Sequence, residues 1–592
     1  MFKRVLSKKL YLSVIGVLLV SLLIAGSSFA LNTESYKEGF SFGEAYQDEI
    51  LNNINIVMAK APENNIDMEQ AVRYAIESED LYNMILPEKV EWMKGVSDGS
   101  GIPYQDILVF NTVDRRITGF LGECTTFMAH GKALASGSGT IIAKNRDLGS
   151  QTLSEIGLHQ AAKHPKGAVY KAAYIDIPET EKTYKFVGSR TAGRWGYGMG
   201  VNEYQVTVAD NDAPSRDILG FVKSLHDNDL VRLILERAST AREGVDVIAA
   251  LVPKFGQAWN GIIYEIGDPN ELWVVAITGP RWVAKKYTDT VTARSNQYQI
   301  RDDYDLAAPD LVSFAVEQGW VPKGTERIDF TKVYSTDELY PADNDLSKRK
   351  NVESLYNTQV RYQRAMELLE KNIGKITPEL LTSLCRDHYD TYKLPSGKVI
   401  ELNQVPIYSS QFAGWGKHEW QVYEPEQDEV PIHMYIRSIC SHGHGGSTAS
   451  SAILLSRPNV SNELGLMLHA FMPPCNSTYI PFYVGITEID HRYTGPEAAV
   501  AFQLIKARSF SQYKLYHNAV RKAFDPYETR LFEEIPTVES QFEELKKADK
   551  EKEANAMLTQ FVKDKCVQAL SLVQAAQDNM TQASRDASKW SR

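Results

Sequence analysis

Residues 122–147 read GECTTFMAHGKALASGSGTIIAKNRD, a segment in which one cysteine precedes a turn and a run of polar residues. Apolar or alternating runs flank the turn, which is rich in glycine and serine, and this pattern is typical of a strand, a turn and a second strand. If the hairpin turns near Ser136, antiparallel pairing places the neighbourhood of Asp147 opposite Cys124, with a register error of about one residue. Lys144 and Asp147 are therefore expected close to the Cys124 thiol.

The residue types gathered in this hairpin suit nucleophilic catalysis by a cysteine. The attacking species is a thiolate, and a nearby cation such as Lys144 lowers the thiol pKa from about 8.5. A carboxylate such as Asp147 can orient an amine or hold the cation in place. A cysteine that starts a strand is also common as a plain core residue, and the hairpin alone leaves this alternative open.

A cysteine nucleophile needs a base, and the histidine cluster in the sequence is His442-Gly443-His444 beside Cys440. The two histidines could bind a metal, but no third and fourth ligand stands at zinc-like spacing, so a loop role is expected and no cofactor is predicted. A cysteine can instead use its own α-amino group, whose pKa of about 7.7–8.0 suits a base at neutral pH. This solution requires scission after Glu123, which would make Cys124 an N-terminus.

The composition describes an ordinary folded protein. The 592 residues are 43% hydrophobic and 23% charged, and they exceed the roughly 250–300 residues of a single core, so one elaborated domain or two to three lobes are expected. The formal net charge is −11, and no segment beyond the N-terminus is rich in lysine and arginine. Nucleic acid is therefore not an expected partner.

The first 30 residues have the three parts of an export signal. Basic residues come first, an apolar run follows over residues 10–25, and Ser28-Phe29-Ala30 resembles a cleavage site with small residues. We predict a signal peptide over residues 1–30 and a secreted or extracytoplasmic protein. The alternative is an uncleaved membrane anchor, because the apolar run approaches the short limit of a spanning helix.

The cysteines are few and widely spaced, which excludes a disulfide scaffold and any CxxC metal motif. Their odd number leaves at least one thiol free, and a free thiol in an oxidising compartment suggests a use for it. The five positions are Cys124, Cys385, Cys440, Cys475 and Cys566.

The region before Cys124 is predicted to be a helical prosegment, residues 31–123. Residues 66–83 and 86–97 have the apolar spacing of helices, and Pro87 suits the first turn of the second helix. No cluster of catalytic residue types appears in this region, so the chemistry is expected to start at Cys124.

After Cys124 the pattern favours strands, and it returns to helices twice. Residues 303–402 are predicted to form a helical insertion, and about 538–592 a C-terminal helical segment with one packed helix over 538–573. The most regular part of the insertion is residues 351–370. Strands are expected at 140–143, 201–209, 273–278, 283–287, 415–423 and 434–439.

Several ordered motifs resemble those of one family. Cys124-Thr125-Thr126, the Gly-Ser-Gly turn and Lys144-Asn145-Arg146-Asp147 are similar to the opening of the cysteine dipeptidases, N-terminal-nucleophile (Ntn) hydrolases related to choloylglycine hydrolase. The likeness covers most of residues 124–592. Later motifs of the family are matched in order by Gly200-Val201-Asn202-Glu203, Val206-Thr207-Val208, Asp268-Pro269-Asn270-Glu271-Leu272-Trp273, Trp282-Val283-Ala284, Ser295-Asn296-Gln297 and residues 473–483.

The resemblance implies a fold and roles for the hairpin residues. The fold is an α+β four-layer αββα sandwich, in which two stacked antiparallel sheets lie between layers of helices. Cys124 would be the nucleophile, and its freed amine the base. Asp147 would orient that amine, and Lys144 stands where related hydrolases carry an arginine, so the charge is kept but the bidentate geometry is lost.

Two asparagines complete the expected site. By position Asn211 matches an oxyanion-hole asparagine, with one residue of ambiguity toward Asp212, and Asn296 matches a second active-site asparagine. A turn or strand-end role is the alternative for both asparagines.

The same resemblance leaves the substrate open. Residues 90–101 of the prosegment are similar to the pre-nucleophile helix of acyl-amide acyltransferases and phospholipase-B-like proteins. The leading function is a self-cleaving dipeptidase, with an N-acyl amide hydrolase or acyltransferase as the alternative and an inactive binding protein on the same fold as the second alternative. The expected partners are a small peptide or acyl amide and the cleaved prosegment, whose apolar helices need a partner surface, while a homo-oligomer stays open.

Overall fold

The computed structural model divides the chain into two compact units. The smaller unit comprises Met1–Thr118 and Val169–Pro178, and the larger comprises Gly119–Ala168 and Glu179–Arg592. The expected signal peptide, residues 442–444 and the strand expected at 415–423 lie outside the described residues. The structure describes residues 33–63, 66–85, 87–112, 123–149, 152–163, 169–171, 176–178, 181–217, 225–257, 261–335, 352–388, 391–393, 399–401, 438–441, 447–511 and 513–590.

The smaller unit is mainly helical. The helices predicted over residues 66–83 and 86–97 are confirmed as α4 and α5, and Pro87 is the first residue of α5, where its missing N–H costs no hydrogen bond. The described elements are α2 (Glu34–Ala45), α3 (Gln47–Glu63), α4 (Met68–Ile85), α5 (Pro87–Ser100), α6 (Tyr104–Thr112) and the hairpin of β5 (Val169–Lys171) and β6 (Asp176–Pro178). None of the helices described in the chain is both long and apolar enough to cross a membrane.

Helices α2 and α5 of this unit touch backbone to backbone. Gly39 and Gly43 on α2 face Gly95 and Gly99 on α5, and a Cβ on any of the four would lie 2.1–2.3 Å from a backbone oxygen of the other helix. Only glycine permits this approach. Helices α2 and α5 of the smaller unit are therefore packed closely against each other.

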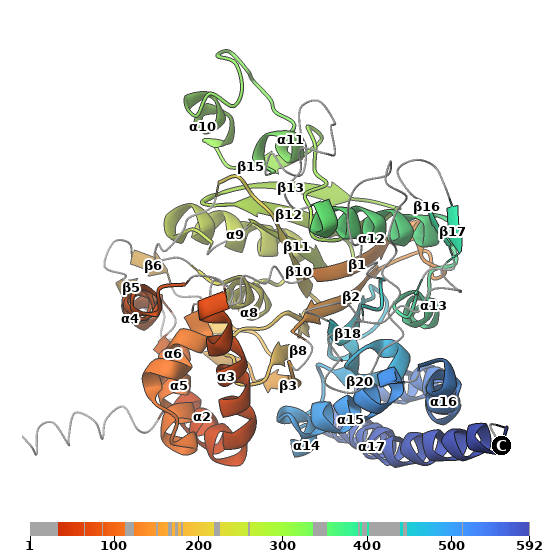
Figure 1. The fold of residues 1–592 in the computed structure, drawn as a ribbon. Coiled ribbons are helices and arrows are strands. Elements are labelled where there is room, and N and C mark those ends of the chain that lie inside the picture. Colours follow the sequence, from red (N-terminus) through yellow and green to blue (C-terminus); the bar gives the residue numbers. More distant parts are fainter. Residues whose placement is uncertain are drawn as a thin grey trace, which may run out of the picture. The chain divides into compact units, whose positions relative to one another are not determined.

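The larger unit contains two main antiparallel sheets (Figure 1). The six-stranded sheet has the order β14 (Val291–Arg294), β1 (Glu123–His130), β2 (Thr140–Leu148), β18 (Ser447–Ser456), β19 (Leu466–Phe471), β20 (Ile480–Tyr483). The eight-stranded sheet has the order β15 (Leu306–Ala307), β13 (Arg281–Tyr287), β12 (Leu272–Thr278), β11 (Gly261–Gly267), β10 (Thr207–Ala213), β9 (Met199–Asn202), β8 (Phe186–Thr191), β3 (Ser154–His159).

These sheets and their helices form the four layers that the sequence predicted. Strands β1 and β2 pack against β10 and β11, and β18 and β19 pack against β8 and β9. Helices α8 (Asp227–Arg237) and α9 (Ala241–Phe255) cover the eight-stranded sheet, while α12 (Val352–Glu370), α15 (Glu497–Ser511) and α17 (Glu551–Trp590) cover the six-stranded sheet (Figure 1). Strands β10, β11, β12 and β18 are buried at every position because both of their faces are covered. The αββα sandwich is confirmed.

The expected strand over residues 201–209 is wrong, because a tight turn divides it into β9 and β10. The Asn202 side chain accepts hydrogen bonds from the backbone N–H groups of Tyr204 (2.9 Å) and Val206 (2.9 Å). Gln205 adopts a positive φ of 60°. Asparagine favours such local side-chain to backbone bonds, which compete with an extended strand.

The single helix expected over residues 538–573 is also wrong. Helix α16 (Tyr513–Lys547) ends inside this range, and α17 begins at Glu551 after a short turn. Asp549 has a positive φ of 58°, and the Lys550 N–H bonds the Leu545 carbonyl at 2.9 Å, which is the geometry of a left-handed helix stop. The apolar pattern continues across the turn because α16 and α17 pack against each other.

The insertion at 303–402 is helical but also contains strands. Its described helices are α10 (Leu311–Glu317), α11 (Phe330–Tyr334), α12 and α13 (Pro378–Leu384), and α12 matches the helix expected over residues 351–370. The strand β15 and the hairpin of β16 (Thr391–Lys393) and β17 (Val399–Glu401) were not expected. Residues 434–437 of the last expected strand lie outside the described residues.

Candidate active site

The hairpin places the polar residues of β2 beside Cys124, as the sequence predicted. Glu123 pairs with Asp147, and Cys124 pairs with Arg146, so the expected register is confirmed to within one residue. Thr126 pairs with Lys144, two residues further along, and therefore lies on the same face of the sheet as Cys124. This face meets the second sheet, so Cys124 is buried between the two sheets.

Lys144 is held as a buried cation by the strand opposite. Its Nζ forms an ion pair with Asp210 Oδ1 at 2.6 Å, donates to the Asp210 carbonyl and lies 3.3 Å from the Gly198 carbonyl. Burial acts to lower the pKa of Lys144, but Asp210 offsets it, and the pKa is raised above the ordinary value. The cation expected near the thiol is therefore present, and Asp210 fixes its position.

In the uncleaved chain the Cys124 thiol is neutral. Burial raises its pKa to about 12; the charge of Lys144 opposes this rise, and the carboxylates of Asp147, Asp210 and Asp212 add to it. A thiol with this pKa carries almost no thiolate at neutral pH. Lys144 alone does not activate the nucleophile, so the chemistry requires a base.

Asn296 holds the backbone nitrogen of Cys124. The Cys124 N–H donates to Asn296 Oδ1 at 2.7 Å, and Asn296 Nδ2 donates to the Asp212 carbonyl at 3.0 Å. These two bonds fix the amide with its oxygen toward the nitrogen that would become the α-amine after scission. Asn296 is thus placed to orient that amine, which is the role expected of Asp147.

Asn211 presents an amide donor instead. Its Oδ1 accepts a hydrogen bond from Thr126 Oγ1 at 3.1 Å, whereas its Nδ2 is buried and has no hydrogen-bond partner among the described residues. Thr126 lies on the same face of β1 as Cys124, so this amide donor is on the side of the candidate nucleophile, where it could stabilise an oxyanion. Between Asn211 and Asp212, this observation favours Asn211 as the oxyanion-hole residue.

Asp147 lies at the end of β2, opposite Glu123. Its Oδ1 accepts a hydrogen bond from Thr448 Oγ1 at 2.6 Å. The carboxylate also acts on the Cys124 thiol, whose pKa it raises. The structure therefore brings Asp147 to the expected scission point, and its orientation of the amine stays a prediction.

An arginine that the sequence analysis missed completes the site. Arg361, on α12, is buried, and its Nη1 donates to Thr125 Oγ1 at 2.9 Å and to the Cys124 carbonyl. Its Nη2 donates to Asn296 Oδ1 at 2.9 Å. Arg361 shares the buried face of α12 with Ala365 and Leu369, and a charged residue on the apolar face of a helix was the signal that could have identified it.

A buried carboxyl group, Glu265 on β11, lies behind the site. Burial raises its pKa to about 8, while Lys144 and Arg294 act to lower it and Asp210 to raise it further. Neither carboxyl oxygen has a hydrogen-bond partner among the described residues. Glu265 and Lys144 are both buried, and burial strengthens the charge interactions in the site.

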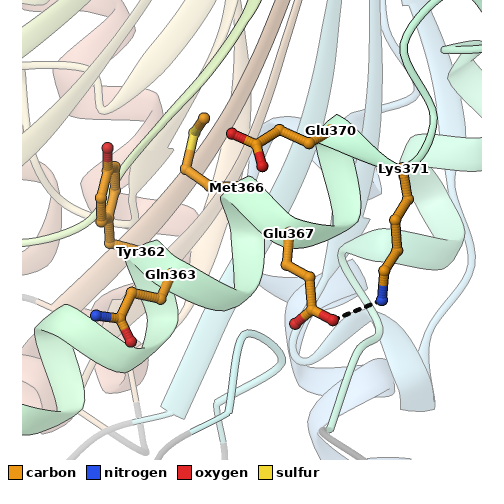
Figure 2. A pocket seen from close by; sticks show the side chains of 6 residues that line it. All are labelled: Tyr362, Gln363, Met366, Glu367, Glu370 and Lys371. Atoms are coloured by element: carbon orange, nitrogen blue, oxygen red, sulfur yellow. Dashed lines mark hydrogen bonds and ion pairs between the residues drawn. The ribbon is translucent and has the colours of Figure 1, made fainter.

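A separate pocket lies along one face of α12 (Figure 2). It has a volume of about 550 Å³, and its lining residues are Tyr362, Gln363, Met366, Glu367, Glu370 and Lys371. Glu367 and Lys371, one turn apart on α12, form an ion pair at 2.5 Å along the helix. Cys124 and the residues around it are not part of this lining, so we do not assign the chemistry to this pocket.

Comparison with known proteins identifies one family and several relatives. The model of peptidase family C69 matches residues 123–529, so the match begins one residue before Cys124. A probable dipeptidase of Salmonella dublin is 24% identical over 386 residues, which cover 61% of this chain and 81% of the relative. A probable dipeptidase of Latilactobacillus sakei is 26% identical over 295 residues, 46% of this chain and 61% of the relative.

Similar solved structures include a mutant of the conjugated bile acid hydrolase from Clostridium perfringens and the penicillin V acylase from Agrobacterium tumefaciens. The first is 10% identical, with a TM-score of 0.29 and coverage of 61% of this chain and 92% of that one. The second is 11% identical, with a TM-score of 0.27 and coverage of 60% and 86%.

Proposed function

The chain belongs to peptidase family C69 and hydrolyses peptide or amide bonds, and from this premise we propose that it is an exported, self-cleaving dipeptidase. Scission between Glu123 and Cys124 makes Cys124 the N-terminal residue of the catalytic chain. Two observations on Cys124 support this proposal. Its thiol is neutral in the uncleaved chain and therefore needs a base, and its backbone nitrogen, the future amine, donates to Asn296 Oδ1 at 2.7 Å.

In the cleaved enzyme, one residue supplies both the attacking atom and the base. The thiol proton moves to the free α-amine, the sulfur attacks the substrate carbonyl, and the carbonyl oxygen gains negative charge. Asn211 Nδ2 donates to this oxygen, and the α-ammonium returns its proton to the leaving amine as the carbon–nitrogen bond breaks. Water then hydrolyses the thioester and releases the acid.

Self-cleavage uses the same thiol on the preceding bond. The Cys124 sulfur attacks the Glu123 carbonyl, and the thiol proton passes to the Cys124 nitrogen as the bond between that nitrogen and the Glu123 carbonyl carbon breaks, which frees the amine and leaves a thioester. Water then hydrolyses the thioester, which releases the Glu123 carboxylic acid and the Cys124 thiol. The family match begins at residue 123, which supports a mature catalytic part that starts at this point. The segment before it then acts as a prosegment, and its apolar helices stay bound to the catalytic part.

Dipeptides are the proposed substrates, because both relatives described above are named probable dipeptidases. The test is a panel of dipeptides and N-acyl amino acids, assayed with processed protein and with the Cys124→Ala variant as the matched blank. We expect turnover of dipeptides, with little release from the acyl amides. Preferential cleavage of acyl amides would establish the acylase alternative, and no turnover of either class would support the inactive binding protein.

Export rests on the sequence of residues 1–30. The matched experiment compares the full chain with a variant in which the apolar run is interrupted by two charged residues, each expressed in a host with a secretory pathway. We expect the full chain outside the cytoplasm, with its N-terminus shortened near Ala30. Retention of Met1 on a membrane-bound product would favour the anchor instead.

A further inference from the structure

Three side chains from separate segments of the larger unit meet at a point where the proposed chemistry has no use for them. The donor atoms of His388, Cys440 and Cys475 all lie within 4.8 Å of one another. His388 follows α13, Cys440 lies in residues 438–441, and Cys475 lies in a short 3-10 helix, η6 (Pro474–Asn476). Both cysteines are fully buried, and His388 is half-buried.

The segments that carry these side chains are fixed by other bonds. Arg386 Nε donates to the Pro474 carbonyl at 2.9 Å, and Arg521 Nη1 donates to the Ser477 carbonyl at 2.6 Å, so η6 is held at both ends. The Cys440 N–H donates to the Asp387 carbonyl at 3.1 Å, which joins the segment of His388 to that of Cys440. The three donor groups therefore sit on a rigid support, as a preformed site requires.

The surroundings of the cluster are aromatic and contain a second imidazole. Tyr513 packs against the two cysteines, and its ring lies 5.7 Å from that of His388 and 4.6 Å from that of His517. His517 Nδ1 is buried and has no hydrogen-bond partner among the described residues. The two cysteines of the cluster are thus buried under an aromatic ring, with nitrogen and sulfur donors close together.

Two thiols and an imidazole form the donor set that zinc prefers. In tetrahedral coordination with bonds of about 2.3 Å to sulfur and 2.0 Å to nitrogen, neighbouring donor atoms lie about 3.5–3.8 Å apart. The observed limit of 4.8 Å is close enough for side-chain rotation to reach this geometry. The alternative use of two close cysteines is a disulfide. A disulfide would not explain why the His388 imidazole also lies within 4.8 Å of both sulfurs, whereas a zinc ion would use all three groups.

We propose that His388, Cys440 and Cys475 bind one Zn²⁺ ion, with water in the fourth position. Binding forms two zinc–sulfur bonds and one zinc–nitrogen bond, and the two thiol protons are released to solvent. No electron is transferred. The ion ties the segment after α13, residues 438–441 and η6 together, and its role is to hold these segments in place.

These segments in turn contact β2 next to Cys124. Asn145 Nδ2 donates to the carbonyls of Cys385 and Ile439, both at 2.8 Å. The Ser441 N–H donates to Thr448 Oγ1 at 3.0 Å, and Thr448 Oγ1 donates to Asp147 Oδ1 at 2.6 Å. The zinc ion would therefore support Asp147 through two linked hydrogen bonds.

The proposal is tested on the full-length protein, purified with a reductant and a chelator that are then removed without oxygen. Zn²⁺ is titrated in competition with a coloured chelator, and Co²⁺ is added separately as a probe of thiolate ligation. We expect one Zn²⁺ per chain and a sulfur-to-cobalt charge-transfer band. Cys440→Ser and Cys475→Ser should each weaken Zn²⁺ binding at least about a hundredfold, beyond the loss typical of outer-shell changes.

The matched control is Cys566→Ser, which removes a buried cysteine outside the cluster and should leave Zn²⁺ binding unchanged. The cobalt spectrum of the wild-type chain decides the matter even if a variant fails to fold. Absence of the charge-transfer band, less than one Zn²⁺ per two chains, or a Cys440–Cys475 disulfide in protein isolated without reductant would overturn the proposal. The intact mass of the zinc-free protein shows whether scission at Cys124 has occurred, and this measurement tests the proposed function separately.

Discussion

Replacing Asn211 with alanine removes one amide donor from the candidate site. Asn211 Nδ2 is buried without an acceptor among the described residues, so it is available for the oxyanion of the reaction. Loss of one such donor raises the barrier by about 2.7–4 kcal/mol, which lowers kcat about 10²–10³-fold. KM should change little, because the donor binds the charge that develops in the transition state rather than the ground-state carbonyl.

Thr126→Val is the control for this prediction. The substitution removes the hydroxyl that donates to Asn211 Oδ1, but it leaves the Asn211 Nδ2 donor in the chain. Each variant leaves a buried polar partner unsatisfied and should lose about 1–3 kcal/mol of stability. Dipeptide kinetics are normalised to the processed fraction, measured by intact mass, and Tm is recorded for both variants. A loss of kcat below about tenfold for Asn211→Ala, or an equal loss for Thr126→Val, would refute the donor role.

Two further predictions concern the buried charges. Lys144→Ala leaves Asp210 buried without its cation and should lower the free energy of unfolding by about 3–5 kcal/mol in urea denaturation, whereas Lys132→Ala, whose side chain is 84% exposed, should cost less than about 1 kcal/mol. Equal effects would contradict the buried pair. Glu265 has a pKa of about 8 in the folded chain against an ordinary 4.5, so the folded state holds the proton more tightly, and this stability is present below pH 4.5 and lost as pH rises to 8. Glu265→Gln should flatten this part of the stability profile by an amount on the order of 5 kcal/mol, and an unchanged slope would contradict the prediction.

The local parts of the structure could be predicted from the sequence. The pairing of Cys124 with Arg146, one residue from the expected Asp147, followed from a short turn between two apolar runs, because hairpin pairing is set within the segment itself. The helices at residues 66–83 and 351–370 followed from apolar spacing in the same way. The turn at Asn202 and the helix stop at Asp549 were missed because each depends on one residue inside a continuous pattern.

The non-local parts of the site could not be derived in this way. Arg361 bonds Thr125 from 236 residues away, and Lys144 meets Asp210 from 66 residues away, so neither pairing leaves a trace in the local pattern. The positions of Asn211 and Asn296 came from the family resemblance. That resemblance could not say that the Asn296 oxygen accepts from the Cys124 nitrogen, or that the Asn211 nitrogen has no acceptor within the part of the chain that the structure describes.

The intact mass of the purified chain tests most directly whether Cys124 becomes its own base. For the wild type, we predict two fragments whose masses add up to the chain plus one water, with the larger fragment beginning at Cys124. The Cys124→Ala chain should remain in one piece. A wild-type protein that cleaves dipeptides while its Glu123–Cys124 bond is intact would contradict the account, because no free amine would then stand beside the thiol.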